Sequence, residues 1–235
     1  MSTPNHLILT VADGTQMHAY TAFPEHTDLA PGLILFQEAF GVNQHIRNVA
    51  DRLAAAGYVV VAPELFHRTA APGLEIPYTD FPSAMPHFQG ITVEGLTQDA
   101  RAAYDWLQGQ SQVQHDKIGA IGFCLGGRVA FVANAALPLQ AAVSYYGGGL
   151  HTLTELAGQL HAPHAFFWGG LDQHISPEQR AQIVAAVDAA GKPYVNTVIS
   201  YADHGFNCDE RPSFNKGAAA EAWGLTLAFF GDKLK

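Results

Sequence analysis

The apolar positions along the chain follow two different spacings, and each spacing predicts one kind of secondary structure. Compact apolar runs predict buried β-strands at residues 32–37, 58–62, 117–123, 140–146, 165–168 and 194–201. Longer amphipathic segments predict α-helices at residues 43–56, 92–108, 125–137, 176–190 and 213–230. Strands that alternate with helices in this way are typical of a mostly parallel sheet covered by helices. We therefore expect an α/β fold with helices on both faces of one central sheet.

The N-terminal part of the chain shows a different pattern. Residues 6–12 and 16–23 alternate between apolar and polar side chains, and Asp13 and Gly14 lie between them. An Asp-Gly pair between two alternating segments is a strong signal for a β-hairpin. An antiparallel hairpin is therefore expected beside the parallel strands.

Residues 63–91 do not fit the alternation of strands and helices. Prolines at positions 63, 72, 77, 82 and 86 prevent one long helix from running through the segment. A connection of this length in a compact domain is usually functional or disordered. The segment is aromatic and carries little charge, so we predict a packed cap over a pocket, lined in part by Phe81 and Phe88. A surface loop without a role is the alternative.

The composition indicates a folded domain rather than a disordered chain. The 235 residues are 48% hydrophobic and only 14% charged, whereas disordered chains are poor in apolar residues and rich in charge. No apolar run approaches the roughly 18 residues that a membrane span requires. Folds of the α/β class with this length are routinely single domains. We therefore expect one domain over residues 1–235.

The charge balance limits the classes of partner. Acidic residues outnumber basic ones by 21 to 12, which gives a formal net charge of −9. Nucleic acids and anionic membrane surfaces would be repelled, so neither is an expected partner. The N-terminus lacks the basic and apolar parts of a secretion signal, and two cysteines suggest no disulfide framework. These features favour the cytoplasm, and the oligomeric state we expect is a monomer or a small homo-oligomer.

The most informative motif lies where the predicted strand at 117–123 meets the following helix. It reads Gly122-Phe123-Cys124-Leu125-Gly126-Gly127. A nucleophile at such a junction, with a glycine two positions away on each side, is typical of the nucleophile elbow of α/β-hydrolases. The turn is so tight that side chains at the flanking positions would collide with backbone, and the helix N-terminus favours a thiolate. Cys124 is therefore the candidate nucleophile; a buried structural cysteine is the alternative.

Asp172 and His204 are the candidate acid and base. Each lies just past the end of a predicted strand, and open α/β sheets bind ligands at the edge where the carboxyl ends of their strands meet. The chain order of nucleophile, acid and base is that of the α/β-hydrolase triad. His204 would then accept a proton, and Asp172 would hold its tautomer. Asp203 competes as the acid, but an adjacent side chain does not easily reach its neighbour's ring.

The segment after the predicted strand at 32–37 offers a second set of candidates. An α/β-hydrolase places one amide of its oxyanion hole here, so the backbone N–H groups of Ala39 and Leu125 are the expected pair. Glu38 is unusual in this place, because a carboxylate at the end of a buried strand is costly unless it has a partner.

Together, residues 37–43, residues 122–127, the turn at Asp172 and residues 203–206 resemble the dienelactone hydrolase family. The resemblance covers nearly the whole chain, and the combination of a cysteine elbow with Glu38 is specific. It implies the α/β-hydrolase fold, no cofactor, and a triad of Cys124, Asp172 and His204. In that family the glutamate holds the resting thiol and takes its proton when substrate binds. By resemblance, Glu38 has this role.

The substrate-binding positions depart from the family pattern. The well-known member of the family binds a substrate carboxylate with two arginines, one in the cap and one shortly after the catalytic histidine. Here Phe81 stands near the first place and Cys208 near the second. The nearest arginine is Arg211, which can simply balance Asp209 and Glu210. Neutral esters or uncharged lactones are therefore the expected substrates.

The remaining candidates concern further contacts to the substrate and the question of a metal or cofactor. The substrate-binding candidates are completed by Tyr145 and Phe206 beside Phe81, Phe88 and Arg211. No metal site is expected, because His161 and His164 flank a proline and cannot share one face of a helix. No phosphate-binding glycine motif is present, so no nucleotide cofactor is expected either.

These observations favour a hydrolase that cleaves a lactone or activated carboxylic ester through an acyl-thioester on Cys124. A thiolate is itself a good leaving group, so esters with good leaving groups suit it better than amides do. A thioesterase or general carboxylesterase is one alternative. A thiol redox or sensor protein, in which Cys124 is oxidised with Cys208 as its resolving partner, is another.

Overall fold

The computed structural model describes residues 5–25 and 29–235. Eight strands in this part of the chain form one sheet with the order β1-β2-β4-β3-β5-β6-β7-β8. The strands are β1 (His6–Thr10), β2 (Gln16–Ala22), β3 (Ala30–Phe36), β4 (Val59–Pro63), β5 (Val113–Phe123), β6 (Ala141–Tyr145), β7 (His164–Gly169) and β8 (Tyr194–Ile199). β1 pairs antiparallel with β2 and β2 with β4, and all other pairs are parallel. The hairpin beside a parallel sheet is therefore confirmed. Residues 1–4, part of the N-terminus considered for a secretion signal, lie outside the described residues.

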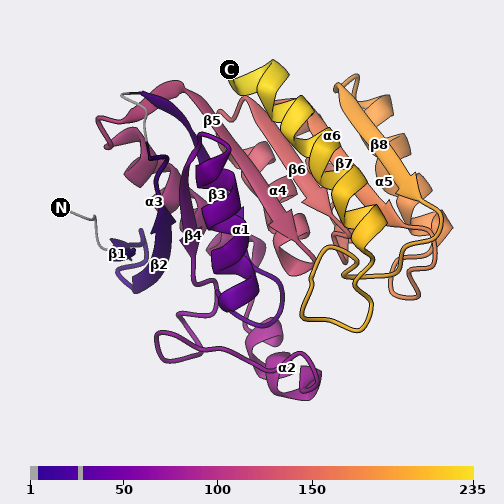
Figure 1. Ribbon diagram of the computed structural model, residues 1–235, viewed down its shortest axis with the longest axis horizontal. Helices are drawn as coiled ribbons and strands as arrows, with labels where there is room; N and C mark the ends of the chain where they lie inside the picture. Colours follow the sequence, from indigo (N-terminus) through magenta and orange to yellow (C-terminus); the bar gives the residue numbers. More distant parts are fainter. Residues whose placement is uncertain (1–4, 26–28) are drawn as a thin grey trace.

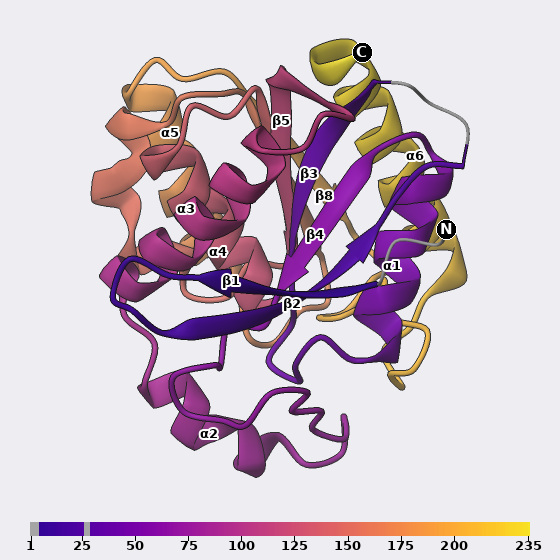
Figure 2. The ribbon, with the colours of Figure 1, turned by 90° about the vertical axis from the view of Figure 1, so that its left-hand side faces the viewer.

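Helices cover both faces of this sheet. They are α1 (Gln44–Ala55), α2 (Phe81–Gln89), α3 (Val93–Gln108), α4 (Leu125–Ala136), α5 (Pro177–Ala189) and α6 (Lys216–Leu234), with short 3-10 turns at Leu150–Thr152 and Thr154–Gln159. Figure 2 shows α1 and α6 on one side of the sheet and α3, α4 and α5 on the other. The predicted α/β fold is confirmed. None of the helices in the described ranges combines the length and apolarity of a membrane span.

The burial of the strands explains why the sequence shows compact apolar runs. Every residue of β3 and β4 is buried, because helices cover both faces and leave no solvated side for polar residues. At the edge of the sheet, β8 keeps exposed positions at Val195 and Val198. The two-sided cover therefore lies over the central strands, which carry the candidate site.

Several element boundaries differ from the prediction, and two of the differences have a clear physical reason. β5 begins at Val113 rather than at Lys117. A bulge interrupts its pairing with β3, since Pro31 pairs with Gln114 but Gly32 pairs with Ile118. The polar residues of this bulge break the apolar run, so the pattern shows only the part of the strand that follows it. The last helix, α6, begins at Lys216 rather than at 213, with Asn215 as its N-cap. The hydrophobic pattern detected the regular part of each element but not these ends.

The cap segment is packed against the body of the protein. It contains the nine-residue helix α2, which begins after the N-cap Asp80 and tolerates Pro86 inside it. Ile76 and Ala84 of the cap are buried with Ala39 and Phe40, which follow β3. Figure 1 shows α2 at the lower end of the sheet, the same end as the connection from β8 to α6. The cap therefore contacts the segment that carries Glu38 and Ala39.

Candidate active site

Cys124 has the backbone conformation of a nucleophile elbow. It lies between β5 and α4 with φ 54° and ψ −113°, a conformation that L-residues rarely adopt and that marks functional sites. A Cβ atom on Gly122 would collide with the backbone of Gly126, and one on Gly126 with the carbonyl of Phe36. The amide of Cys124 donates to the carbonyl of Tyr145 at 3.0 Å. Only glycines fit around this turn, as the sequence pattern predicted.

The structure brings the three candidate triad residues into one hydrogen-bonded row. His204 Nε2 lies 3.2 Å from Cys124 Sγ, and His204 Nδ1 lies 2.8 Å from Asp172 Oδ2. The other carboxylate oxygen of Asp172 accepts the backbone amides of His174 and Ile175. Asp203 instead accepts its neighbour's amide, from His204 N, at 2.6 Å. Asp172 therefore contacts the imidazole, and the competing acid does not.

The charges of the row support one another. Burial alone would lower the pKa of His204, but the Cys124 thiolate and the hydrogen bond to Asp172 raise it to about 10. Burial alone would raise the pKa of Asp172, but the hydrogen bond and charge of His204, together with the amides of His174 and Ile175, lower it overall. The N-terminus of α4, which begins at Leu125, adds positive potential at the sulfur. The site thus favours the protonated, imidazolium form of His204 beside the sulfur.

The two backbone amides expected to form an oxyanion hole follow the ends of β5 and β3. Leu125 is the first residue of α4, so its N–H has no acceptor within the helix. Ala39 lies just past β3 and is fully buried. Within residues 5–25 and 29–235, neither amide donates to a protein acceptor. This arrangement is what an oxyanion hole requires.

Glu38 is paired with an arginine that the sequence reasoning assigned elsewhere. The Glu38 carboxylate is 0% exposed, and its Oε1 accepts a hydrogen bond from Arg211 Nη1 at 3.2 Å. The guanidinium also lies over the rings of Phe40 and Tyr78, at 5.7 and 5.8 Å. The partner of Arg211 is thus Glu38 rather than its acidic neighbours in the sequence, and the residue reaches the site from the loop before α6.

The resting contact that the family resemblance implies for Glu38 is also different here. In the described residues no hydrogen bond joins Glu38 to the Cys124 sulfur, which faces His204 instead. Glu38 Oε2 is buried and has no hydrogen-bond partner among those residues. Among the described residues, one oxygen is therefore held by Arg211 and the other has no donor.

Tyr146 is a site residue that the sequence reasoning missed. Its ring lies 5.1 Å from the His204 ring, measured between centroids. The neighbouring Tyr145, which was the candidate, is fully buried and bonds its hydroxyl to Thr226 of α6 at 2.7 Å. Tyr145 is the last residue of β6, whereas Tyr146 follows the strand with φ +37°, so the two side chains have different surroundings. Nothing in the sequence distinguished them.

The other aromatic candidates occupy different depths. Phe206 is fully buried and meets the Tyr146 ring edge-on at 5.3 Å, so it supports the site rather than lining it. Phe81 is 47% exposed and lies 6.2 Å from Phe40, and Phe88 packs behind it. Phe81 and Phe88 therefore belong to the cap surface above the Ala39 segment.

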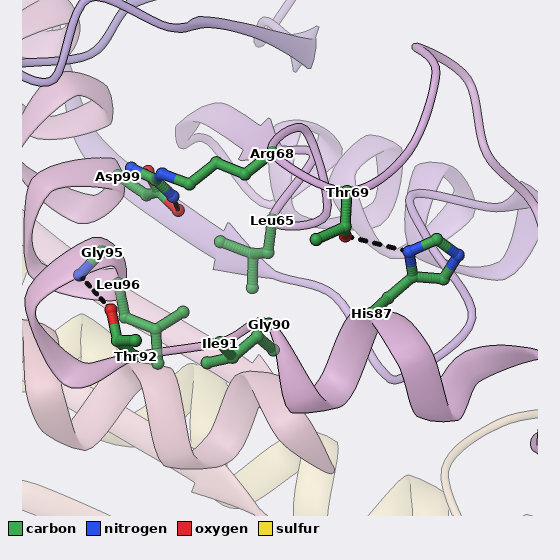
Figure 3. Close-up of a pocket in the computed structure, with 10 residues that line it drawn as sticks. All are labelled: Leu65, Arg68, Thr69, His87, Gly90, Ile91, Thr92, Gly95, Leu96 and Asp99. Atoms are coloured by element: carbon green, nitrogen blue, oxygen red, sulfur yellow. Dashed lines mark hydrogen bonds and ion pairs between the residues drawn. The ribbon is translucent and has the colours of Figure 1, made fainter.

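A small cavity lies between the cap and α3, away from these residues. Figure 3 shows its lining, in which Arg68 pairs with Asp99 and His87 with Thr69. The cavity measures about 20 Å³, which is room for about one water molecule. Its polar groups are already paired and it contains no triad residue. It is not a substrate pocket.

One group of side chains in the described part of the chain could in principle hold a metal ion. Ligand atoms of His45, Cys208 and Asp209 lie within 4.8 Å of one another. His45 Nδ1 and Asp209 Oδ1 are already joined by a hydrogen bond of 3.0 Å. Burial, and next the Glu38 carboxylate, raises the pKa of the Cys208 thiol to about 12. The thiol is thus neutral, and the His45–Asp209 bond fastens the loop before α6 to α1.

Comparison with known proteins agrees with this geometry. The profile of the dienelactone hydrolase family matches residues 17–234. A Synechocystis protein, assigned provisionally as a carboxymethylenebutenolidase, is 34% identical over 239 residues, which cover 94% of this chain and 93% of that protein. A protein of Escherichia coli K12 with the same provisional assignment is 33% identical over 233 residues, or 93% of this chain and 83% of that one.

A solved structure gives the same result in three dimensions. The crystal structure of a provisionally assigned dienelactone hydrolase from Klebsiella pneumoniae superposes with a TM-score of 0.85. The two chains are 30% identical, and the match covers 96% of this chain and 98% of the other. From the family profile, the relatives and the elbow at Cys124, we conclude that this chain belongs to the dienelactone hydrolase family of α/β-hydrolases.

Proposed function

We propose that this hydrolase cleaves lactones or activated carboxylic esters through an acyl-thioester on Cys124. The observation that carries the proposal is the hydrogen-bonded row from the Cys124 sulfur through His204 to Asp172. Such a row supplies a nucleophile, a base and a group that orients the base. The two free amides at Leu125 and Ala39 support the same chemistry, because they can stabilise the tetrahedral intermediate.

In the acylation step, the Cys124 thiolate, which forms when Glu38 takes the thiol proton, attacks the carbonyl carbon of the ester. The carbon–sulfur bond forms, and the carbonyl electron pair moves to the oxygen, where the two amides stabilise the charge. When the intermediate collapses, the carbon–oxygen bond to the leaving group breaks. The leaving oxygen takes the proton from His204 Nε2, and an acyl-thioester with a neutral His204 remains.

Deacylation uses the same residues in reverse. His204 Nε2 takes a proton from water while the water oxygen attacks the thioester carbonyl. The carbon–sulfur bond then breaks, and the acid leaves. The thiolate of Cys124 and the imidazolium of His204 are restored, while the Nδ1 proton stays hydrogen-bonded to Asp172 throughout. Glu38 then returns its proton to the sulfur as the product leaves. The net reaction is one ester and one water to one acid and one alcohol.

Glu38 is proposed to control the reactivity of the thiol. A carboxylate near a thiol disfavours the thiolate, and Arg211 offsets that charge only while the two remain paired. When substrate enters between them, the freed carboxylate can accept the thiol proton, as the family resemblance implies. Its unpartnered Oε2 supports this role, because a buried carboxylate oxygen without a donor is a group available for a proton.

The decisive experiment is Cys124→Ala, assayed with the wild type on a panel of aryl esters and lactones. We expect a loss of several orders of magnitude on any substrate that the wild type hydrolyses, with an unchanged circular dichroism spectrum. Cys208→Ser is the matched control, because it removes the other thiol and should hydrolyse normally. If Cys124→Ala keeps most of the activity, the nucleophile is wrong.

The same pair of variants tests the alternative of a redox sensor. A resolving cysteine must form a thiolate, but the raised pKa of Cys208 keeps that thiol protonated at neutral pH. We therefore expect activity without any oxidant. A requirement for a disulfide between Cys124 and Cys208 would favour the sensor. A thioesterase remains within the proposed chemistry and is distinguished by including acyl-thioesters in the panel.

A further inference from the structure

Tyr146 keeps a backbone conformation that is unfavourable for a tyrosine. It follows β6 directly, with φ +37°, in the left-handed region where a bulky residue is strained. Its N–H donates to the carbonyl of Phe167 at 2.8 Å, which holds this conformation in place. Glycine would adopt it without strain. The phenol must therefore supply something that a glycine could not.

The hydroxyl of Tyr146 is buried, and no described residue forms a hydrogen bond with it. An unpaired buried hydroxyl is destabilising, and such groups are rare in native proteins unless a ligand, an ion or water completes them. The adjacent tyrosine provides the contrast, because Tyr145 is equally buried but bonds to Thr226. The structure therefore leaves one hydrogen-bond donor open inside the candidate site.

The surroundings of the phenol indicate which part of the site it serves. Its ring packs beside the ring of His204, so its direction is fixed. Burial raises the pKa of Tyr146 well above its usual value, and the Glu38 carboxylate raises it further, more strongly than the Cys124 sulfur does. The group is thus a neutral donor at physiological pH, held beside the ring of His204.

We propose that Tyr146 is a specificity-determining residue whose hydroxyl donates a hydrogen bond to a second oxygen of the substrate. This proposal rests on the proposed esterase function. The scissile carbonyl lies at Cys124 and the two amides, so the oxygen that Tyr146 binds is a second one, which the proposal places in the acyl group. Esters whose acyl group carries an ether, ring or carbonyl oxygen there are the preferred substrates.

The test compares two esters of nearly equal size on two enzymes. p-Nitrophenyl methoxyacetate carries an ether oxygen where p-nitrophenyl butyrate carries a methylene group. The ratio of their kcat/KM values is measured for the wild type and for Tyr146→Phe, so that the different intrinsic reactivity of the esters cancels. We expect the preference for methoxyacetate to fall by about 5- to 10-fold in the variant, as expected for one lost hydrogen bond.

Tyr145→Phe is the matched control, since it removes a paired hydroxyl one residue away. It should lower Tm by about 2–4 °C, because it breaks the bond to Thr226, and leave the ester ratio unchanged. Tyr146→Phe should show the opposite pattern, with an unchanged or higher Tm and a lower ratio. A purely structural role for Tyr146 would move Tm but not the ratio.

The outcomes separate the two proposals. If the wild type hydrolyses both esters and Tyr146→Phe leaves their ratio unchanged, the role of Tyr146 is refuted while the esterase function stands. If the variant loses rate equally on both esters and alkylates Cys124 at a changed rate, its hydroxyl acts on the protein, and the specificity role is again refuted. If the wild type hydrolyses no member of the wider panel, the proposed function fails, and the role of Tyr146 fails with it.

Discussion

Removal of Arg211 should destabilise the protein far more than removal of an exposed arginine. Glu38 is 0% exposed, and Arg211 supplies its one hydrogen bond in the described residues while being itself only 18% exposed. Arg211→Met would keep the apolar bulk of the side chain but leave the carboxylate buried without a partner. Breaking a buried ion pair in this way costs about 3–5 kcal/mol.

The magnitude can be measured by guanidinium denaturation and by thermal unfolding near pH 8, where free carboxylates are ionised. For a chain of this size each kcal/mol lowers Tm by about 2–4 °C, so Arg211→Met should lower Tm by about 6–20 °C. Arg47→Met is the control, because Arg47 pairs with a Glu75 side chain that is 46% exposed. That change should cost about 1 kcal/mol or less.

A double-mutant cycle identifies the cause of the loss. Glu38→Gln removes the buried charge, so the double variant Glu38→Gln/Arg211→Met should recover most of the stability lost in Arg211→Met. We expect a coupling energy of about 2 kcal/mol or more between the two positions. If Arg211→Met costs less than about 1 kcal/mol, or if the double variant is no more stable than it, then the argument from an unpaired buried charge is refuted.

Three further predictions concern activity. His204 stays protonated below its raised pKa of about 10 and loses that proton above it. Asp172→Asn should therefore lower this pKa and move the alkaline limb of the kcat/KM profile toward neutral pH. An alkaline limb that does not move would contradict the pairing of Asp172 with His204. The free enzyme should react slowly with iodoacetamide, and Glu38→Gln should change that rate at Cys124 and impair turnover; if neither changes, Glu38 does not control the thiol. Because Glu38 already neutralises Arg211, a substrate with a remote methyl ester should be turned over better than the matching free acid. A tenfold preference for the acid, about 1.4 kcal/mol, would show instead that Arg211 leaves Glu38 for the substrate.

The sequence alone determined the order of strands and helices and the position of the elbow, because both depend on local residue patterns. The elbow at Cys124 was predictable because its turn is a local junction of strand and helix, in which a Cβ atom on Gly122 would collide with the backbone of Gly126. Asp172 and His204 were predictable because parallel strands place their carboxyl ends at one edge, so two loops far apart in the chain meet there. The spacing of the apolar residues also predicted the sheet and its covering helices, because two-sided burial leaves no polar positions in the central strands.

Other features were decided only by the tertiary structure. Arg211 reaches Glu38 across 173 positions of the sequence, and its nearest acidic residues in the chain are not its partner in space. Tyr145 and Tyr146 are the same residue type side by side, and the direction of the strand end alone places one against Thr226 and the other against His204. Hydrophobic periodicity and local steric limits involve residues close together in the chain, so they can be recognised from the sequence. The pairing of buried polar groups depends on how loops pack across the sheet edge, and only the folded chain specifies it.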